Sequence, residues 1–298
     1  MNGPVVILGC TGMLGQALMR EAQSRGLQAV GLSRRQSAGV DLACIDSIGP
    51  LLAPLAPGLV INAAAMTSLE ACEANPGAAY LINARLPALL ARSAIERDMR
   101  WVHVSSDHFF CAAFNVLHDE FAPVTLVNEY ARSKYAGEAF ARSDPGALVL
   151  RTNIVGRRGW RGQPSFAEWA LAALDKGEPF AAYSDVWASS IEVGQFAQAL
   201  FDLVQCGARG LVNLAAREST SKAAFIRALA LATGRDPDLA RGGSRPADVL
   251  LPRATAMGLN VARAEAMMGR RLPDAAAVIA ALAESFKTVR EESVHAHP

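Results

Sequence analysis

The sequence has almost no net charge and few aromatic side chains. Its 298 residues include 29 Lys and Arg against 28 Asp and Glu, a net charge of +1, and only 6% of them are aromatic although 51% are hydrophobic. Such a balance supplies no basic field that would attract nucleic acid or an anionic membrane surface. We therefore expect small-molecule ligands, with no nucleic-acid and no membrane partner.

Cysteine is scarce, and long uninterrupted hydrophobic runs are absent. The five cysteines are scattered and never occur in a Cys-x-x-Cys spacing, so the sequence predicts neither a disulfide framework nor a zinc site. Proline, glycine or asparagine breaks the longer apolar stretches, and no basic segment precedes the first of them. These features predict a cytoplasmic protein with reduced thiols at Cys10, Cys44, Cys72, Cys111 and Cys206.

The histidines do not suggest a metal site either. His103, His108 and His118 lie among acidic residues, but no pair has the His-x-x-x-His spacing that places two ligands on one helix face. His103 falls within a predicted buried strand, on the face opposite to its neighbours. We therefore predict no metal.

A glycine-rich loop follows the first predicted strand directly. Residues 5–8 form a short apolar run typical of a strand buried on both faces, and residues 13–25 form a helix that ends at Gly26. Glycines between them allow a tight turn and a close approach of the backbone to a pyrophosphate at the helix N-terminus. The alternative is a purely structural turn. The predicted cofactor contacts here are Gly9, Thr11, Gly12, Met13, Leu14 and Gly15.

The end of the second predicted strand indicates which dinucleotide would bind. Residues 28–32 are followed by Ser33, Arg34 and Arg35. Proteins that bind NAD usually have an acidic residue at this place, which binds a hydroxyl of the adenosine ribose, and this sequence has none. The positive charge instead favours a ribose 2′-phosphate, and hence NADP, with NAD as the alternative cofactor. The segment could also be a basic surface loop that binds no ligand. Asp41 and Leu42 close a weak third strand and would border the adenine.

Strands and helices alternate through the first half of the chain. A strand over 59–65 ends in the small residues Ala63, Ala64 and Ala65, a helix spans 76–97, and a strand over 101–104 leads into Ser105, Ser106 and Asp107. This alternation predicts an α/β fold with a doubly wound parallel sheet of the Rossmann type. Sites in such sheets lie beyond the carboxyl ends of the strands, where these polar residues fall.

Tyr130 and Lys134 are the candidate acid–base pair. Residues four apart share one face of a helix, so the ammonium can lie beside the phenol and is expected to lower its pKa. A hydroxyl of Ser105 or Ser106 would hold a substrate carbonyl against the tyrosine. A Tyr/Lys pair on an exposed helix face is the alternative.

The composition changes after Arg151. We predict a dinucleotide-binding domain over residues 1–152, with a return segment at about 190–215, and a smaller mixed α/β substrate lobe over 153–189 and 216–298. The basic loop 157–162 could border a substrate diphosphate, or it could be an exposed linker into the lobe. Arg245 and Arg253, each beside a proline, are further candidates for substrate contacts.

The order of these motifs resembles that of the extended short-chain dehydrogenase/reductases, and most of all the dTDP-4-dehydrorhamnose reductase branch. Later segments as far as residues 269–273 also match that branch. The motifs are Gly9-x-x-Gly12-x-x-Gly15, Asn62-Ala63-Ala64-Ala65-Met66-Thr67, Asn83, Ser105-Ser106-Asp107, Tyr130-x-x-x-Lys134-x-x-Gly137-Glu138 and Arg151-Thr152-Asn153.

The resemblance implies an NAD(P)-dependent oxidoreductase that reduces the 4-keto group of a nucleotide-linked deoxysugar. It assigns catalysis to Ser106, Tyr130 and Lys134, and it adds Asn83 to the cofactor contacts. Ala131, His108 and Ile154 depart from the family pattern and leave the identity of the sugar open. The implied substrate contacts are Thr67, Ser105, Ser106, Asp107, His108, Tyr130, Asn153 and Arg253.

Two alternatives stay open beside the reductase. The first is an epimerase or dehydratase on the same fold, although dehydratases place more than one acidic residue after the serine and only Asp107 is present here. The second is a non-catalytic cofactor-binding subunit, similar to the regulatory subunit of methionine adenosyltransferase. The oligomeric state is open, and a homodimer is one option.

Overall fold

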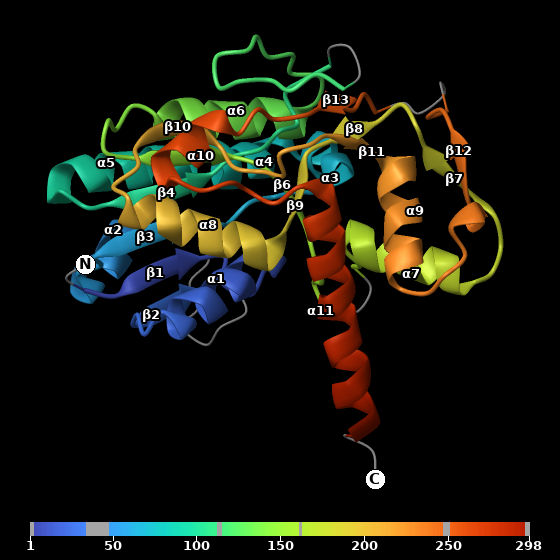
Figure 1. Ribbon diagram of the computed structural model, residues 1–298. Helices are drawn as coiled ribbons and strands as arrows, with labels where there is room; N and C mark the ends of the chain where they lie inside the picture. The colour runs from blue at the N-terminus through green and yellow to red at the C-terminus, as the bar shows by residue number, and fades with distance from the viewer. Residues whose placement is uncertain (1–2, 34–47, 112–114, 161–162, 247–250, 296–298) are drawn as a thin grey trace.

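The computed structural model describes residues 3–33, 48–111, 115–160, 163–246 and 251–295. Its centre is a six-stranded sheet in the order β10-β5-β4-β3-β1-β2, and every neighbouring pair is parallel (Figure 1). The doubly wound parallel sheet predicted from the sequence is confirmed. In chain order the strands are β1 (Val5–Leu8), β2 (Ala29–Leu32), β3 (Leu59–Asn62), β4 (Trp101–Val104), β5 (Leu148–Arg151) and β10 (Gly210–Asn213).

Helices cover both faces of this sheet because successive side chains of each strand point to opposite sides. Val5 and Ile7 of β1 belong to one hydrophobic core with helices α1 and α8, whereas Val6 and Leu8 belong to a second core with α2 and α5. Such two-sided burial explains why the strands are almost uniformly apolar. These helices, together with α6, which carries Tyr130 and Lys134, are α1 (Met13–Ser24), α2 (Ile48–Leu52), α5 (Leu86–Arg97), α6 (Glu129–Ala141) and α8 (Val193–Gln205).

The helix predicted over residues 76–97 contains a π-helical turn. It runs as α4 (Pro76–Tyr80), the π turn η3 (Leu81–Arg85) and α5. Asn83 lies in this turn, and a Cβ on Gly137 of α6 would come within 1.8 Å of its carbonyl oxygen. The two backbones are therefore in direct contact, which only glycine at position 137 allows.

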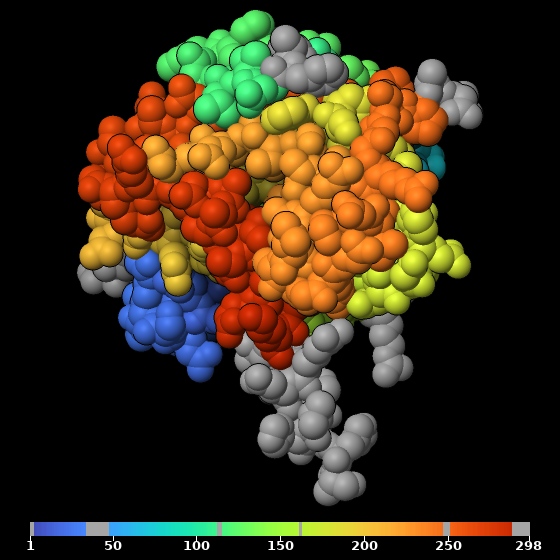
Figure 2. All heavy atoms as spheres, turned by 45° about the vertical axis from the view of Figure 1, so that its right-hand side comes forward, coloured from blue at the N-terminus to red at the C-terminus, as the bar shows by residue number. Residues whose placement is uncertain are grey.

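A second lobe packs beside the sheet around its own hydrophobic core, in which α7, α9 and α11 meet. Its remaining strands form small separate sheets, and Figure 2 shows the orange segment of α9 and β12 as one face of this lobe. The domain boundaries given above stay a prediction. The elements that follow β5 outside the sheet and its covering helices are β6 (Asn153–Val155), α7 (Phe166–Asp175), β7 (Phe180–Tyr183), β8 (Trp187–Ala188), β9 (Ser190–Glu192), β11 (Thr220–Ser221), α9 (Lys222–Ala232), η4 (Pro237–Leu239), β12 (Ala240–Gly243), β13 (Ala256–Met257) and α11 (Ala275–His295).

Three short elements remain in the described chain. The last helix, α11, extends away from the rest of the protein in Figure 1. Over the described residues, no helix combines the length and the apolar character needed to span a membrane. The shorter elements are η2 (Ala53–Leu55), α3 (Leu69–Ala74) and α10 (Ala262–Met268).

A buried ion pair joins α6 to the sheet. Arg151, at the end of β5, binds Glu138 of α6 through two hydrogen bonds of 2.7 and 2.9 Å, and both side chains are almost fully buried. Ser105 donates a third hydrogen bond to the same carboxylate at 2.8 Å. The guanidinium also lies 5.5 Å from the ring centre of Phe109. Two elements that carry candidate site residues are thus held together by one buried charge network.

We predict that Arg151→Met destabilises the protein by roughly 3–5 kcal/mol, because it leaves the Glu138 carboxylate buried without its partner. Chemical denaturation would measure this change. The double variant Glu138→Gln/Arg151→Met should recover much of the loss, since it removes both charges. Arg92→Ala, which breaks the exposed pair with Glu96 on α5, serves as the control and should leave the midpoint unchanged. A midpoint equally insensitive to Arg151→Met would contradict the role assigned to the pair.

Candidate functional site

Ser106 and Tyr130 meet beyond the carboxyl end of β4. Ser106 follows β4 in the chain, and Tyr130 lies in the first turn of α6, whose N-terminus is capped by Asn128. The tyrosine hydroxyl donates a hydrogen bond to Ser106 Oγ at 3.3 Å, and Oγ also accepts the backbone N–H of His108 at 3.1 Å. The structure therefore brings together the hydroxyl and the phenol that the sequence pairs.

Lys134 lies one turn further along α6 and is almost fully buried. Its ammonium donates a hydrogen bond of 2.7 Å to the carbonyl oxygen of Val104, the last residue of β4. Burial lowers the pKa of Lys134 to about 8, while the nearby Glu138 carboxylate opposes this shift. The lysine is thus anchored to the strand that ends at the site.

Tyr130 is a weaker acid than the sequence suggests. Burial raises its pKa to about 12, the negative charges of Asp107 and Cys72 add to the effect, and the hydrogen bond with Ser106 opposes it. The prediction that Lys134 lowers the pKa of this tyrosine is wrong for the protein without ligands. The physical reason is that removal of the phenol from water outweighs the attraction of an ammonium that is turned to a backbone carbonyl.

Ser105 and Ser106 point to different environments because they are neighbours at the end of a strand. Ser105 Oγ donates to the buried Glu138 carboxylate, so its hydroxyl belongs to the ion-pair network that joins α6 to the sheet. Of the two serines that the sequence offers as substrate contacts, the structure brings only Ser106 to Tyr130.

Asp107 and Asn153 form a buried polar pair at the same edge. Asn153 Nδ2 donates to Asp107 at 2.7 Å, and Ser190 donates to the amide oxygen of Asn153 at 2.8 Å. Burial raises the pKa of Asp107 to about 7, against the hydrogen bond from Asn153 and the positive charge of Lys222, which lower it. The carboxyl group can therefore change its charge near neutral pH.

His108 covers the tyrosine from one side. Its ring meets that of Tyr130 edge-on, with the ring centres 5.7 Å apart. Burial lowers the pKa of His108 to about 4, and the positive charges of Arg253 and Lys222 add to this shift. Among the described residues, its Nε2 atom is buried without a hydrogen-bond partner. A neutral imidazole with an unused nitrogen thus faces the site.

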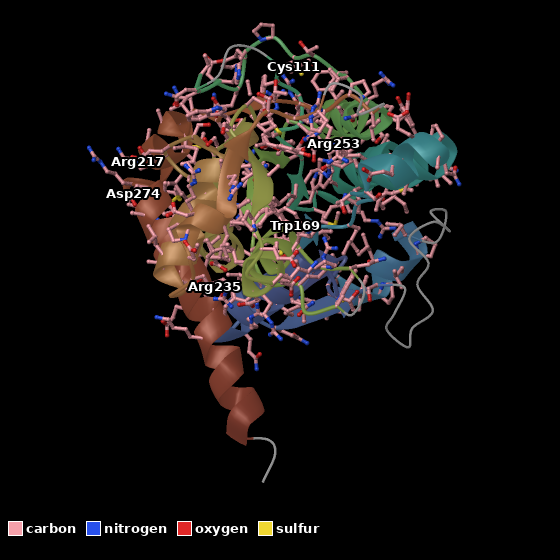
Figure 3. All side chains as sticks on the ribbon, turned by 90° about the vertical axis from the view of Figure 1, so that its right-hand side faces the viewer. Cys111, Trp169, Arg217, Arg235, Arg253 and Asp274 are labelled. Atoms are coloured by element: carbon pink, nitrogen blue, oxygen red, sulfur yellow. The ribbon has the colours of Figure 1, made fainter. Side chains whose placement is uncertain are left out.

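Thr67 and Arg253 lie further out. Thr67 is exposed, and Arg253, labelled in Figure 3, is 43% exposed and forms an ion pair with Glu70 of α3. Arg253 is nevertheless close enough to shift the pKa of His108, so it lies at the mouth of the site and outside its centre.

Sequence reasoning missed Asn128 and Lys222. Asn128 is fully buried, caps α6 through Ala131 N at 2.8 Å, and donates to the carbonyl oxygen of Pro252 at 2.9 Å. Lys222 acts on the pKa of both Asp107 and His108, which places its charge near these two side chains. The cap could have been found from an asparagine just before a helix, whereas the lysine has no local signal.

The three loop glycines serve different purposes. Gly9 has φ +81°, and a Cβ on Gly15 would come within 2.1 Å of the Gly9 carbonyl oxygen, so the fold itself requires both. A Cβ on Gly12 would meet only that oxygen, at 3.2 Å. Gly12 also starts α1 with no side-chain cap, which leaves first-turn N–H groups such as those of Met13 and Leu14 available to an anion. Apart from this single tight contact the position is open, and we predict that a dinucleotide phosphate lies there.

Other predicted cofactor contacts differ in their placement. Ser33, at the end of β2, is buried and its hydroxyl has no partner among the described residues, which suits a ribose. Ala63–Ala65 leave β3 as a loop, so the predicted strand is three residues too long. Four predicted contacts lie outside the described residues: Arg34, Arg35, Asp41 and Leu42.

Asn83 holds the loop that follows β3. Its side chain accepts from Met66 N at 2.9 Å and donates to Met66 O and to Ser133 Oγ, both at 3.0 Å. It is 1% exposed. Its hydrogen-bonding groups are thus used within the protein, and its contribution is to hold the loop that follows β3 against α6.

The basic loop after residue 156 is tied to α7. Gly159 N donates to Glu168 at 2.8 Å, and the guanidinium of Arg158 lies 5.4 Å from the ring centre of Trp160. Residues 161–162 lie outside the described chain. The two interpretations of this loop, diphosphate contact and linker, both stay predictions.

We also searched the described part of the chain for metal sites. No group of three or more His, Cys, Asp or Glu side chains within it could hold a metal ion.

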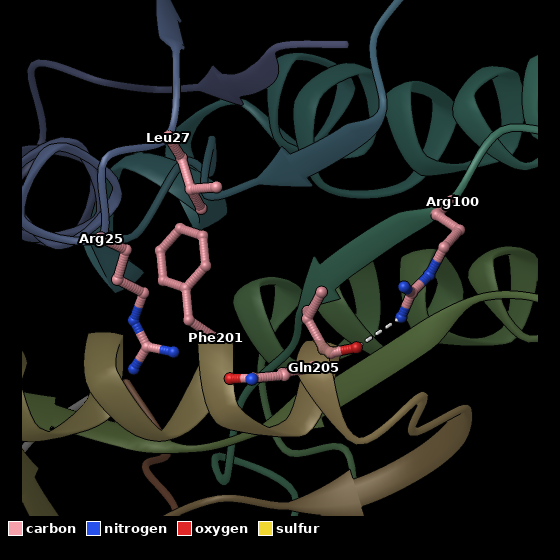
Figure 4. Close-up of a pocket in the computed structure, with 6 residues that line it drawn as sticks. Arg25, Leu27, Arg100, Phe201 and Gln205 are labelled. Atoms are coloured by element: carbon pink, nitrogen blue, oxygen red, sulfur yellow. Dashed lines mark hydrogen bonds between the residues drawn. The ribbon is translucent and has the colours of Figure 1, made fainter. Parts of the chain in front are cut away.

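A groove of about 530 Å³ lies at the opposite, amino-terminal edge of the sheet (Figure 4). Its two arginines already bind protein partners, since Arg25 pairs with Glu21 and Asp202 and Arg100 donates to Val204 O. It is remote from the groups described above.

Comparison with known proteins adds an independent finding. A family model described as the RmlD substrate binding domain matches residues 1–287. The chain is 28% identical over 294 residues to a probable low-salt glycan biosynthesis reductase, Agl14, of Haloferax volcanii, covering 94% of this chain and 97% of that one. It is 34% identical over 247 residues to the dTDP-4-dehydrorhamnose reductase of Mycobacterium tuberculosis, covering 80% of this chain and 78% of that one.

Solved structures share the fold. A dTDP-4-dehydrorhamnose reductase from Bacillus anthracis, crystallised with NADP, superposes with a TM-score of 0.84 at 20% identity, over 95% of this chain and 98% of that one. A hypothetical dTDP-4-dehydrorhamnose reductase from Sulfolobus tokodaii gives a TM-score of 0.80 at 24% identity, over 90% and 96% of the two chains.

We predict that Gly12→Val abolishes dinucleotide binding without unfolding the protein, because its side chain would fill the open space at the start of α1. Calorimetric titration with NADPH, together with thermal denaturation, would measure both properties. The comparison variant is Gly15→Ala, which should lower the melting temperature because its Cβ would overlap backbone atoms. Retained NADPH affinity in a folded Gly12→Val protein would refute this account of the loop.

Asp107 should make the protein less stable as the pH rises from about 4 to about 7. In this range the unfolded chain releases the proton of Asp107 while the folded protein keeps it, since the folded pKa is raised from 3.8 to about 7. Relative to Asp107→Asn, the parent should lose stability on the order of a few kcal/mol across the range. Urea denaturation at a series of pH values would test this, and identical pH slopes in parent and variant would argue against it.

Proposed function

Since the chain belongs to the family described as the RmlD substrate binding domain, we propose that it is an NADPH-dependent reductase of nucleotide-linked 4-keto deoxysugars. It is an oxidoreductase of the extended short-chain dehydrogenase/reductase kind. The observation that carries the proposal is the meeting of Tyr130, Ser106 and Lys134 beyond the carboxyl end of β4, in a sheet whose first loop leaves space at Gly12.

Ser106 and Tyr130 would hold the carbonyl oxygen of the substrate. Their hydroxyls are 3.3 Å apart, so a carbonyl oxygen placed against both can accept one hydrogen bond from each. NADPH supplies the hydride when it is bound. Negative charge then grows on the carbonyl oxygen, and the two hydroxyls stabilise it before Tyr130 gives up its proton.

The protonation state of Tyr130 is the one that a proton donor needs. With a pKa of about 12 the phenol keeps its proton at neutral pH, so it can act as a proton donor. An epimerase needs the same group to take a proton in its oxidising step, and burial opposes the phenolate that this requires. Lys134, whose pKa is lowered to about 8, lies one turn away on α6 and is anchored to the carbonyl oxygen of Val104.

The polar groups around this centre would orient the sugar. Asp107 and Asn153 present a hydrogen-bonded pair, and His108 presents its unpaired Nε2 atom. The dTDP-4-dehydrorhamnose reductase of Mycobacterium tuberculosis is 34% identical to this chain, and its name indicates the class of sugar. We include NADP(H) as the cofactor and the cytoplasm as the location in this proposal, and we assign no oligomeric state.

We predict that Tyr130→Phe lowers kcat by roughly 10²–10⁴-fold and changes NADPH affinity little, because it deletes only the hydroxyl that donates the proton. The assay follows NADPH oxidation over a panel of nucleotide-linked 4-keto deoxysugars. Tyr135→Phe is the matched control, since Tyr135 lies on the same helix and packs edge-on against Phe109. It should retain activity.

Three outcomes would overturn the proposal. A Tyr130→Phe enzyme within a few-fold of the parent would remove the tyrosine from the mechanism. Conversion of substrate without net NADPH consumption would indicate an epimerase, and a parent that turns over none of the panel would favour the non-catalytic subunit.

A further inference from the structure

Lys222 lies where two elements of the second lobe meet. It is the first residue of α9, whose N-terminus is capped by Ser221, and its own backbone N–H donates to Val186 O at 2.9 Å. The half-buried ammonium lies 4.1 Å from the ring centre of Phe166, the first residue of α7. The backbone and the ring together fix where this charge is presented.

The charge of Lys222 is incompletely compensated. Burial lowers its pKa, and the carboxylate of Asp107 opposes that shift. Within the described part of the chain, however, its Nζ has no hydrogen-bond acceptor, and Asp107 is bound by Asn153. A half-buried ammonium that has no acceptor within the described chain is available to an oxygen-bearing ligand, which would stabilise its charge.

His108 and Arg253 surround the same space. Arg253 comes from the segment before β13, Lys222 comes from α9, and the positive charges of both lower the pKa of His108. Its Nε2 atom is buried and has no partner among the described residues. Two cations and one neutral imidazole therefore lie near Tyr130, and one of the cations, Arg253, is also paired with Glu70. Such a set suits an anionic group with several oxygens.

We propose that Lys222 binds an anionic oxygen of the substrate and is a specificity-determining residue of this pocket. The inference rests on the proposed function, because it assigns a ligand group to the same site. A phosphate oxygen of a nucleoside diphosphate and a carboxylate on the sugar share this chemistry. A lysine suits either, since its ammonium acts as a point charge with three donors.

The test compares Lys222→Met and Lys222→Gln with the charge-retaining Lys222→Arg, and it uses Lys176→Met as a control at an exposed lysine. Calorimetry with thymidine and uridine diphosphates, the parent nucleosides, and a nucleoside-diphospho-uronic acid separates the two anions. We expect the neutral variants to lose roughly 10- to 100-fold in affinity for the anion concerned, with Lys222→Arg within a few-fold of the parent. Nucleoside affinity and NADPH affinity should stay unchanged.

Each outcome has one meaning. Weaker diphosphate binding assigns Lys222 to the phosphate, whereas loss confined to the uronic acid assigns it to a sugar carboxylate. Unchanged affinities for both, or a parent that binds neither, would overturn the inference. An alkaline shift of the kcat–pH profile with unchanged affinities would likewise overturn it, and would show that Lys222 acts only by keeping Asp107 ionised. Binding needs no turnover, so a parent that binds anions through Lys222 but reduces no 4-keto sugar would refute the proposed function and leave this inference intact.

Discussion

The buried ion pair between Glu138 and Arg151 is the constraint on which the candidate site depends. Tyr130 and Lys134 reach the pocket from α6, and Ser106 and Asp107 reach it from the end of β4, so their distances are set by how α6 lies on the sheet. Glu138 fixes that position through Arg151 of β5 and Ser105 at the end of β4. The two adjacent serines thus have different roles: Ser105 binds Glu138 in the buried network, and Ser106 binds the hydroxyl of Tyr130.

The parts of the molecule that could be predicted from the sequence are those that follow local rules. Buried strands, the glycine loop and the spacing of Tyr130 and Lys134 express backbone geometry over a few residues, and all appear in the structure. The direction of the Tyr130 pKa could not be predicted, because it depends on burial by distant segments. The π turn at Asn83 also arises from a tertiary contact, with Gly137 fifty-four positions later. The position of Lys222 near Asp107 could not be predicted for the same reason, because only the fold brings these two residues together.

Burial gives this pocket an unusual balance of charge. The phenol of Tyr130 and the imidazole of His108 are neutral at pH 7, and Asp107 is near its midpoint. The fixed positive charges at its border come from Lys134, Lys222 and Arg253, which lie on three separate segments. Positive charges on separate segments around a neutral phenol and a neutral imidazole suit a reaction that develops negative charge on oxygen.

Asn128 makes two hydrogen bonds that reach different parts of the structure. Its amide oxygen holds the first turn of α6, and its amide nitrogen holds the carbonyl of Pro252, beside Arg253 in the second lobe. One side chain thus connects the start of the helix that carries Tyr130 to the segment that carries Arg253. Because Asn128 is fully buried, loss of either hydrogen bond would leave half of its amide without a partner. The placement of the proton donor and the placement of the segment around Arg253 are therefore coupled through a single amide group.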